Sequence, residues 1–196
     1  YRSNYVNILS NFKKKRKTIL INQGTISRYK VEGILGKVNL YLIKHLYKRS
    51  DVIVVSTSGM YVDMQNLFHF KNEIKIIYNP NDIVYISKKA EEEVNDFDFR
   101  PDIKYIISVG RLVHLKRIDL IIKALKILID KDYKVNLIII GEGPEEDNLR
   151  LLVVNLNLLD YVHFLGRKEK PFKYMANSTA LVLSSESEGM GNVLIE

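Results

Sequence analysis

The stretch YIISVGRLVHLKRIDLIIKALKILIDKDYKVNLIII, residues 105–140, contains a strand, a helix and a second strand in succession. Residues 105–109 and 135–140 are short apolar runs rich in Ile and Val, which is typical of buried parallel strands. Residues 118–129 carry apolar side chains at the spacing of an amphipathic helix. This order predicts two parallel strands in one sheet, joined by a right-handed crossover helix.

The same alternation continues on both sides of this unit. Further strands are expected over residues 18–21, 51–56, 75–78, 162–165 and 180–183, and further helices over residues 35–48, 58–70 and 145–155, with a last helix beginning near Asn192. Ser58 is the expected N-cap of the second of these helices. The pattern predicts an α/β fold with parallel sheets and helices on both faces.

Residues 88–102 interrupt the alternation. They include Glu91, Glu92 and Glu93 in a row, which is typical of a surface connection between two domains. We therefore expect one domain with its linker in residues 1–95 and a second domain in residues 96–196. The chain starts at Tyr1 and stops inside an expected helix, so we expect it to be truncated at both ends.

Composition narrows the class of protein. Hydrophobic residues make up 46% of the chain and charged residues 27%, as in ordinary globular proteins. The absence of cysteine excludes disulfides and thiolate metal sites. No apolar run reaches the length that crosses a bilayer. A cytoplasmic location is expected.

Positive charge is concentrated at the N-terminus. Residues 1–50 contain 12 Lys and Arg against one acidic residue, a net charge of +11, whereas the other 146 residues contain 18 basic and 22 acidic residues, a net of −4. Such a block favours anionic partners: phospholipid headgroups, a lipid pyrophosphate or nucleic acid. A solvated lysine-rich face is an equally good interpretation.

Three expected strand ends carry residues suited to ligand binding, since ligands of open α/β sheets bind at the carboxyl ends of strands. After the first, Gly110 permits close backbone approach, and Arg111 and Lys116 supply cations for phosphate oxygens. By themselves these are more often solvated loop residues. The second end, residues 141–144, is Gly-Glu-Gly-Pro and by itself indicates a structural turn.

The third end is residues 184–196, SSESEGMGNVLIE. Its two glycines precede an expected helix, so backbone amides would point at a phosphate at the positive end of the helix. Glu188 and Glu196 can border the same cleft, where carboxylates accept hydrogen bonds from sugar hydroxyls. Two surface glutamates are the alternative.

These motifs, in this order, resemble glycosyltransferase family 4, the retaining enzymes of the GT-B fold. The resemblance spans roughly residues 40–196. It is carried by residues 50–56 (SDVIVVS), 76–80 (IIYNP), 109–112 (VGRL) with Lys116, 141–144 (GEGP), 162–166 (VHFLG) and the Glu188–Glu196 pair. It implies two Rossmann-like domains, the first only partly present, with the nucleotide-sugar donor bound by residues 96–196.

The resemblance also implies roles for individual residues. Arg111 and Lys116 would bind the donor diphosphate and stabilise the leaving group, and Glu188 would contact the donor sugar, so these three form the expected catalytic set. Glu196 would bind the ribose, and Gly166 and Arg167 would lie beside the base. The complete expected donor-binding set is Gly110, Arg111, Lys116, Gly166, Arg167, Glu188, Gly189, Met190, Gly191, Asn192, Val193 and Glu196. The family needs no obligatory metal, so no cofactor or metal ligand is expected.

Some positions depart from the family pattern. Gly191 occupies a position where many members have proline. Arg117, two residues before Asp119, occupies a position where glycine is common. Residues 20–24, LINQG, lack the histidine that this segment often contains, and His45 is expected at the surface. The glycine-rich loop of the acceptor side is not in the sequence.

The function implied is transfer of a hexose-type sugar from a nucleotide-sugar to a polysaccharide or lipid-linked acceptor in cell-surface glycan synthesis, including lipopolysaccharide. The alternatives are an inactive nucleotide-sugar-binding fragment, or an epimerase or phosphorylase of the same fold. Residues 1–50 would meet an anionic membrane surface at the inner face of the cytoplasmic membrane. Nucleic acid is the least favoured partner, because few aromatic residues, among them Tyr29 and Tyr41, are interleaved with the basic residues.

Overall fold

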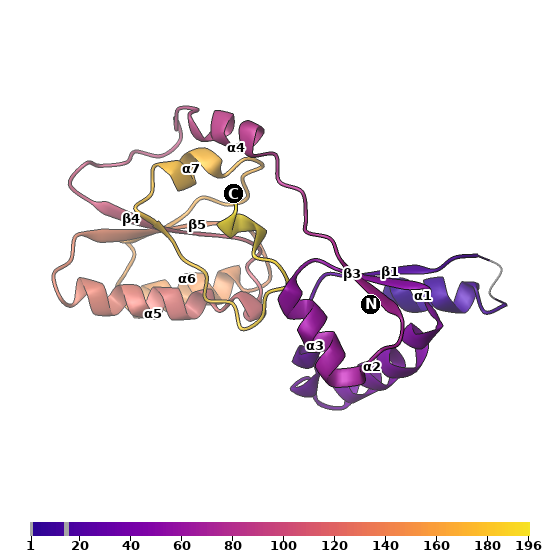
Figure 1. Ribbon diagram of the computed structural model, residues 1–196. Helices are drawn as coiled ribbons and strands as arrows, with labels where there is room; N and C mark the ends of the chain where they lie inside the picture. The colour runs from indigo at the N-terminus through magenta and orange to yellow at the C-terminus, as the bar shows by residue number, and fades with distance from the viewer. Residues whose placement is uncertain (1, 14–15) are drawn as a thin grey trace. The chain divides into compact units, whose positions relative to one another are not determined.

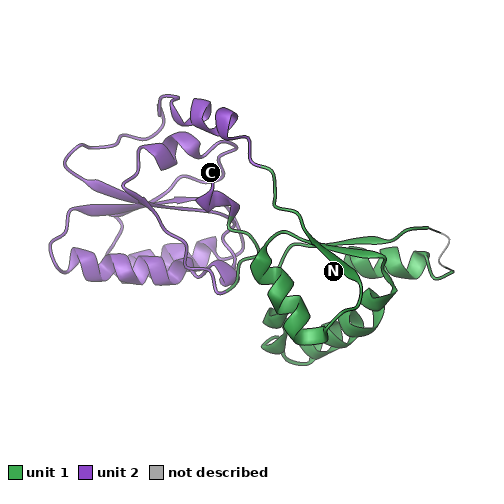
Figure 2. Ribbon diagram, viewed as in Figure 1, with its two compact units in different colours: residues 1–80, 187–191 green, residues 81–186, 192–196 purple. Residues whose placement is uncertain are grey.

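A computed structural model describes residues 2–13 and 16–196, and the chain forms two compact units (Figures 1 and 2). Unit 1 comprises residues 1–80 and 187–191, and unit 2 comprises residues 81–186 and 192–196. The compact units divide after Pro80, whereas the sequence-based boundary falls after residue 95. Residues 1, 14 and 15 of the basic N-terminal block lie outside the described residues.

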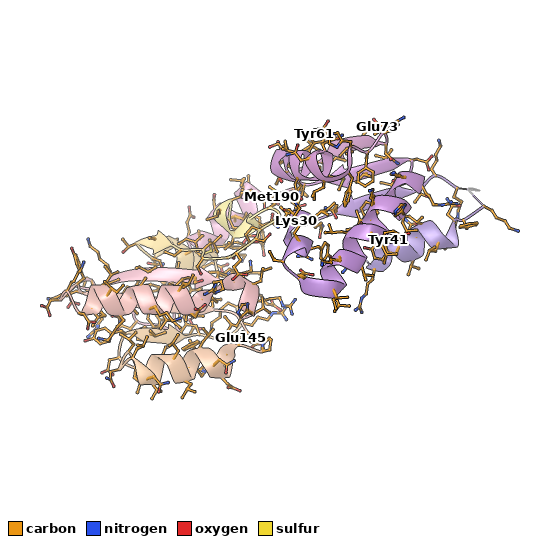
Figure 3. All side chains as sticks on the ribbon, turned by 90° about the horizontal axis from the view of Figure 1, so that it is seen from below. Lys30, Tyr41, Tyr61, Glu73, Glu145 and Met190 are labelled. Carbon is orange, nitrogen blue, oxygen red and sulfur yellow. The ribbon has the colours of Figure 1, made fainter. Side chains whose placement is uncertain are left out.

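Unit 1 contains a parallel sheet of three strands in the order β1-β2-β3. Its helical segments are α1 (Arg2–Ser10), η1 (Ser27–Lys30), α2 (Gly33–Leu46), η2 (Tyr47–Arg49) and α3 (Ser58–Phe68), and its strands are β1 (Ile19–Asn22), β2 (Val52–Val55) and β3 (Glu73–Ile76). Tyr61 and Glu73, which belong to α3 and β3, are labelled in Figure 3. The sheet therefore has the parallel pairing that the sequence predicts.

The core of unit 1 lies on one face of this sheet. Leu20 and Ile53, paired across β1 and β2, are fully buried beneath side chains of α1, α2 and α3. Ile19 and Ile21 alternate with Leu20 along β1 and are 55% and 60% exposed. The described helices of this unit thus cover one face of the sheet, whereas helices on both faces were expected.

Helix α1 lies beside strand β1. The side-chain amide of Asn4 donates to the carbonyl of Ile21 at 2.9 Å, and that of Asn7 donates to the carbonyl of Ile19 at 3.2 Å. These carbonyls belong to an outer strand of the described sheet, on the side away from β2. Two side chains of a helix therefore satisfy backbone acceptors that a further strand would otherwise pair with.

Unit 2 contains a parallel sheet of four strands in the order β6-β5-β4-β7. Its strands are β4 (Lys104–Val109), β5 (Val135–Ile140), β6 (Val162–Phe164) and β7 (Ala180–Leu181), and its helical segments are α4 (Ile83–Ala90), η3 (His114–Lys116), α5 (Ile118–Ile129), α6 (Glu146–Asn155), α7 (Phe172–Ala176) and η4 (Asn192–Leu194). All four strands run parallel, so their carboxyl ends meet at one edge of the sheet.

Both faces of the unit 2 sheet are covered, as predicted. Every residue of the central strand β5 is buried. Leu137 and Ile139 pack on one face with α5 and α6, whereas Ile138 and Ile140 pack on the other with Tyr174 of α7. Alternate side chains of one strand thus fill two cores, which explains why five of the six residues of β5 are apolar.

The stretch expected to be a surface connection, residues 88–102, instead packs on unit 2. Its first residues finish α4, and Val94, Phe97 and Phe99 join the core on the α7 side of the sheet. The Phe97 ring lies edge-on to that of Tyr105, with centroids 5.5 Å apart. Acidic residues of this stretch alternate with partly buried aromatic ones, so the stretch packs on unit 2 along most of its length.

The predicted bounds of α5 and β5 are confirmed. Helix α3 is capped by Thr57, whose hydroxyl accepts from the Met60 amide at 3.2 Å, and not by Ser58. Strand β3 lies two residues earlier than expected. His45 is exposed on α2, as expected. The helices α1, α4 and α7 were not predicted.

Candidate functional site

Three neighbouring strands of unit 2 continue into glycines at their carboxyl ends. Gly110 follows β4, Gly141 follows β5, and Gly166 follows β6 by one further residue. The Gly110 amide donates to the Ile140 carbonyl and the Gly141 amide to the Gly166 carbonyl, each at 2.9 Å. The three glycines therefore form a continuous backbone step across three strand ends, which we call the glycine ledge.

The glycine ledge depends on the missing side chain of Gly141. Its φ is +145°, and a Cβ atom there would lie 1.8 Å from the carbonyl oxygen of Gly110. Only glycine permits the two backbones to approach so closely. Gly143 is similar, because a Cβ would meet the Leu112 carbonyl oxygen at 2.3 Å. The segment that by itself indicated a structural turn thus also shapes this edge of the sheet.

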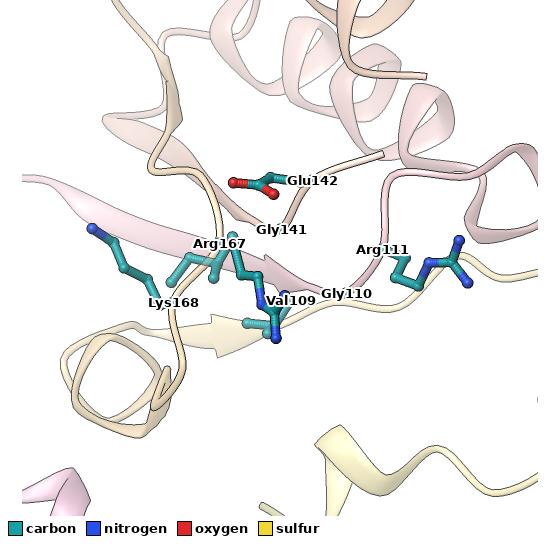
Figure 4. Close-up of a pocket in the computed structure, with 8 residues that line it drawn as sticks. Val109, Gly110, Arg111, Gly141, Glu142, Arg167 and Lys168 are labelled. Atoms are coloured by element: carbon teal, nitrogen blue, oxygen red, sulfur yellow. The ribbon is translucent and has the colours of Figure 1, made fainter. Parts of the chain in front are cut away.

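A pocket of about 440 Å³ lies over the glycine ledge (Figure 4). Its volume falls within the range of about 300–1,000 Å³ that is usual for small-molecule sites. The residues that line it come from all three strand ends: Val109, Gly110, Arg111, Ile140, Gly141, Glu142, Arg167 and Lys168. The pocket therefore lies where open parallel sheets bind ligands.

Cationic side chains surround this pocket. Arg111 and Arg167 are exposed and flank Gly110 in Figure 4. The side chain of Lys116 also reaches the ledge, since its Cε lies 3.8 Å from where a Cβ of Gly110 would stand. Exposed guanidinium groups and a lysine beside open backbone suit the oxygen atoms of phosphate groups.

Lys168, which lines the pocket, is held by Asp96 from the stretch of residues 88–102 that packs on the α7 side of the sheet. Its Nζ donates to the Asp96 carboxylate at 2.6 Å, and the Tyr174 hydroxyl donates to the same carboxylate at 2.6 Å. The hydrogen bond from Lys168, followed by that from Tyr174, lowers the pKa of Asp96 to about 2. Part of the positive charge at this wall is thus balanced within unit 2.

The loop that carries Lys116 is tied to the segment after β7. The Ser184 hydroxyl donates to the carbonyls of Lys116 and Arg117 at 2.8 and 2.7 Å, and the Glu186 amide donates to the Leu115 carbonyl at 3.0 Å. The Arg117 guanidinium donates to the Glu186 carboxylate at 2.7 Å. These contacts fix the backbone on both sides of Lys116.

Arg117 itself adopts the left-handed conformation, with a φ of +48°, where the resembling family commonly has glycine. Its guanidinium bonds the Asp119 carboxylate at 3.0 Å in addition to Glu186, and both hydrogen bonds raise its pKa. In return, the Arg117 hydrogen bond lowers the pKa of Asp119 to about 2, and Lys123 adds to the effect. Ion pairs thus accompany a backbone conformation that is unusual for arginine.

Residues 187–191 belong to unit 1. The Ser187 hydroxyl lies 2.8 Å from that of Thr25, and the Thr57 hydroxyl donates to the Gly189 carbonyl at 3.5 Å. A Cβ on Gly189 would lie 2.1 Å from the Gln23 carbonyl oxygen. The predicted donor-binding residues Glu188, Gly189, Met190 and Gly191 therefore share a compact body with the carboxyl ends of β1 and β2; Met190 is labelled in Figure 3.

Asn192, Val193 and Glu196 belong to unit 2. The helix expected from Asn192 is a single 3-10 turn, η4, in which the Asn192 carbonyl accepts from the amides of both Ile195 and Glu196. The five residues from Asn192 can close only one turn.

The structure thus brings Gly110, Arg111, Lys116, Gly166 and Arg167 together at one edge of the unit 2 sheet. Lys168 was not predicted from the sequence, although it directly follows a predicted residue. Ser184 and Glu186 were given no role either, because their contact with the Lys116 loop depends on β7 lying beside β4.

Within residues 2–13 and 16–196, no three His, Asp or Glu side chains gather as metal ligands would. The helices of this part of the chain are each too short or too polar to span a membrane.

Comparison with known proteins gives consistent similarities. The chain is 35% identical to the N-acetylgalactosamine-N,N'-diacetylbacillosaminyl-diphospho-undecaprenol 4-alpha-N-acetylgalactosaminyltransferase of Campylobacter jejuni, over all of this chain and 52% of that protein. It therefore spans about half the length of this relative.

Solved structures show the same fold. S. aureus TarM, crystallised with UDP among other ligands, superposes with a TM-score of 0.72 at 25% identity, over 91% of this chain and 34% of TarM. Anabaena HepE, in complex with UDP and glucose, gives a TM-score of 0.76 at 19% identity, over 99% of this chain and 53% of HepE. The similarity to HepE concerns the fold, which is that of GT-B glycosyltransferases.

The family model described as "Glycosyl transferases group 1" matches residues 89–196, which include every strand of unit 2 and the whole glycine ledge. The match covers more than half of the chain. The predicted family is confirmed: this chain belongs to the glycosyl transferases group 1 family.

Proposed function

We propose that this chain is the part of a retaining glycosyltransferase that binds the nucleotide-sugar donor. The observation that carries the proposal is the glycine ledge with Arg111, Lys116 and Arg167 around it. An open backbone edge bordered by three cations fits a diphosphate better than a neutral ligand. TarM, the relative structure at 25% identity, contains UDP, which supports a nucleoside diphosphate as the bound group.

The proposed chemistry is electrostatic. Departure of the nucleoside diphosphate places negative charge on its oxygens, and fixed cations stabilise that charge. Arg111 and Lys116 are the proposed catalytic cations, and Lys116 is suited to this because its loop is tied to Ser184 and Glu186. Glu188 is the proposed third catalytic residue, contacting hydroxyls of the donor sugar.

The remaining contacts follow the same proposal. Glu196 binds ribose hydroxyls, and the backbone amides from Met190 to Val193, including those of Gly191 and Asn192, hold phosphate oxygens. Gly166 and Arg167 lie beside the base. No metal takes part, so chelation of divalent cations leaves donor binding unchanged.

The proposed acceptor is a polysaccharide or lipid-linked saccharide of cell-surface glycan synthesis. The Campylobacter relative is named for a diphospho-undecaprenol substrate, and other similar proteins are named for lipopolysaccharide core and poly(ribitol-phosphate) glycosylation. Such acceptors are anionic or lie at membranes, which is consistent with the +11 charge of residues 1–50. The protein would then act at the inner face of the cytoplasmic membrane.

Calorimetry tests the donor site directly. The chain is titrated with UDP, GDP, ADP and CDP, with and without EDTA, and Lys116→Ala is compared with Lys131→Ala, which changes an exposed lysine in the turn after α5. We expect one nucleoside diphosphate to bind independently of EDTA, and only Lys116→Ala to weaken it. If none binds, the donor site is misassigned.

An activity assay separates the remaining alternatives. The nucleotide-sugar that binds best is incubated with the chain, and products are resolved by chromatography. Transfer to an acceptor or slow donor hydrolysis supports the proposal. Epimerised donor indicates an epimerase, and binding without any turnover indicates a nucleotide-sugar-binding fragment.

A further inference from the structure

Helix α2 of unit 1 has an apolar stripe that the other described residues leave exposed. Val31 just before the helix and four residues within it are 49–88% exposed, although all are large and hydrophobic. Their spacing is that of one helical face, with steps of three, one, three and three residues. We call Val31, Ile34, Leu35, Val38 and Tyr41 the apolar stripe; Tyr41 is labelled in Figure 3.

The orientation of α2 makes this exposure unavoidable. Gly36 and Ile43 lie on its buried side, and Ile43 is inaccessible to solvent. A Cβ on Gly36 would lie 2.0 Å from the Tyr29 carbonyl oxygen, so the helix contacts η1 by its backbone. Rotating α2 to bury the apolar stripe would break this contact and expose Ile43. Among the described residues, the stripe therefore faces away from the core of unit 1.

Basic residues border the apolar stripe. Lys37 and Lys44 lie three residues after Ile34 and Tyr41, so each neighbours a stripe residue on the helix surface. Lys30 and Lys48 lie just beyond the two ends of the helix, and all four lysines are exposed. Glu32 is the only acidic residue among positions 30–50, and its carboxylate lies 3.9 Å from the guanidinium of Arg28. We call Lys30, Lys37, Lys44 and Lys48 the lysine row.

An apolar face with a basic border is complementary to an anionic lipid bilayer. The apolar side chains of such a helix enter the boundary between headgroups and acyl chains, and lysines at the edge meet lipid phosphates. Tyr41 suits this boundary because its ring is apolar and its hydroxyl polar. A water-facing helix would gain nothing from five exposed apolar side chains in one line.

We propose that α2 docks unit 1 onto anionic phospholipid membranes, with the apolar stripe inserted and the lysine row on the headgroups. This proposal rests on the proposed function in one respect: membrane docking would bring the enzyme to a lipid-linked acceptor. The proposal is more specific than attraction by the net charge of residues 1–50. It assigns the membrane contact to particular residues of α2 and requires their apolar side chains to insert into the bilayer.

Vesicle co-sedimentation of the chain tests this proposal. Vesicles contain phosphatidylcholine alone or with about one-third phosphatidylglycerol, enough to give a negative surface potential. Ile34→Ser/Leu35→Ser removes two stripe residues, and Leu151→Ser/Val154→Ser on α6 is its control, since both of those residues are also exposed. Lys37→Glu/Lys44→Glu reverses two charges, with Lys71→Glu/Lys131→Glu as the control. Circular dichroism verifies that each variant is folded.

We expect the wild-type chain to bind the anionic vesicles and not phosphatidylcholine alone. The Ile34→Ser/Leu35→Ser variant should bind at least about tenfold more weakly, because two aliphatic side chains lose burial. The Lys37→Glu/Lys44→Glu variant should bind at least about twentyfold more weakly, since each lysine contributes about fivefold. Both control variants should bind as the wild type does.

Three results would overturn the proposal. One is equal vesicle binding by the Ile34→Ser/Leu35→Ser variant and the wild type, which would mean attraction without insertion. Another is binding that does not depend on anionic lipid. A third is self-association in analytical ultracentrifugation that this variant abolishes, with no vesicle binding, which would assign the face to a second copy.

These measurements test the proposed donor site and the proposed membrane surface independently. Vesicle binding is measured without donor or acceptor, and Lys116→Ala should leave it unchanged. Nucleotide binding without vesicle binding removes this inference alone, and vesicle binding without nucleotide binding removes the proposed function alone.

Discussion

Arg117 and Glu186 are joined across 69 positions of sequence by a hydrogen bond of 2.7 Å between guanidinium and carboxylate. Glu186 also donates its amide to the Leu115 carbonyl, so it holds the chain on both sides of Lys116. A lysine on a mobile loop would lose entropy each time it bound a phosphate. The Arg117–Glu186 pair removes part of that cost before the ligand arrives.

Glu186→Gln should therefore weaken nucleoside diphosphate binding without abolishing it. The variant keeps the backbone contact but loses the ion pair, whose partners are partly exposed, so we expect a decrease of about two- to fivefold. Calorimetry measures it, with Glu169→Gln, another exposed glutamate of unit 2, as the control. Identical affinities in the wild type and both variants would show that the pair does not order the loop.

Lys116→Ala and Glu188→Ala should each reduce sugar transfer by about 100-fold or more in the full-length enzyme. Both remove a proposed contact to charge or hydroxyl groups at the reacting end of the donor. Steady-state kinetics with a saccharide acceptor gives the rates, and Lys131→Ala should retain them. Near-wild-type turnover in both variants would mean that neither residue belongs to the catalytic set.

Gly141→Ala should destabilise unit 2 by about 2–4 kcal/mol, because the added Cβ meets the Gly110 carbonyl and the φ of +145° suits only glycine. Gly59→Ala in α3 is the matched control: its nearest atom would be 3.9 Å away, and alanine favours the helix by about 0.4–1 kcal/mol. Urea unfolding measures both. Equal tolerance of the two alanines would be inconsistent with the observed backbone contact.

The lowered pKa of Asp96 predicts that the stability of unit 2 depends on pH. Its pKa is lowered to about 2 from an ordinary 3.8, so the folded protein binds this proton less readily than the unfolded chain. The stabilisation is therefore complete above about pH 5 and is lost as the pH falls toward 2. Because the side chain is 48% exposed, its contribution is at most about 1 kcal/mol.

Asp96→Asn isolates this effect. Its stability should lie below that of the wild type at pH 6, and the difference should shrink as the pH approaches 2. Asp98→Asn, two residues away and also exposed, should show no such convergence. Parallel curves for wild type and Asp96→Asn at all pH values would show that the bonds from Lys168 and Tyr174 do not stabilise the fold.

The elements best predicted from the sequence are those whose own residues carry a complete pattern of buried apolar side chains. Residues 118–129 and 135–140 carry complete apolar patterns, so α5 and β5 have the predicted bounds. Helix α4 was missed because Asp82 belongs to a turn cluster that was interpreted as the end of a strand. The same aspartate caps α4, accepting from the Tyr85 amide at 2.9 Å. Helix α7 has only five residues, too few for a periodic pattern.

The candidate site was predictable where it depends on strand ends alone. Gly110, Arg111 and Lys116 follow β4 in the sequence, and Gly166 and Arg167 follow β6. The contact between Gly141 and Gly110 requires β4 and β5 to be neighbours, and the Arg117–Glu186 bond requires β7 beside β4. Strand order is a property of the whole sheet, so these relationships could not be read from one loop.

The amides of Asn4 and Asn7, bonded to the carbonyls of β1, have a consequence for solubility. An outer strand with open carbonyls is a template for strands of other molecules and promotes edge-to-edge aggregation. Helix α1 occupies two of those acceptors. Within the described residues, α1 thus protects this side of the sheet from pairing with a strand of another molecule, and loss of α1 would make unit 1 more prone to aggregate.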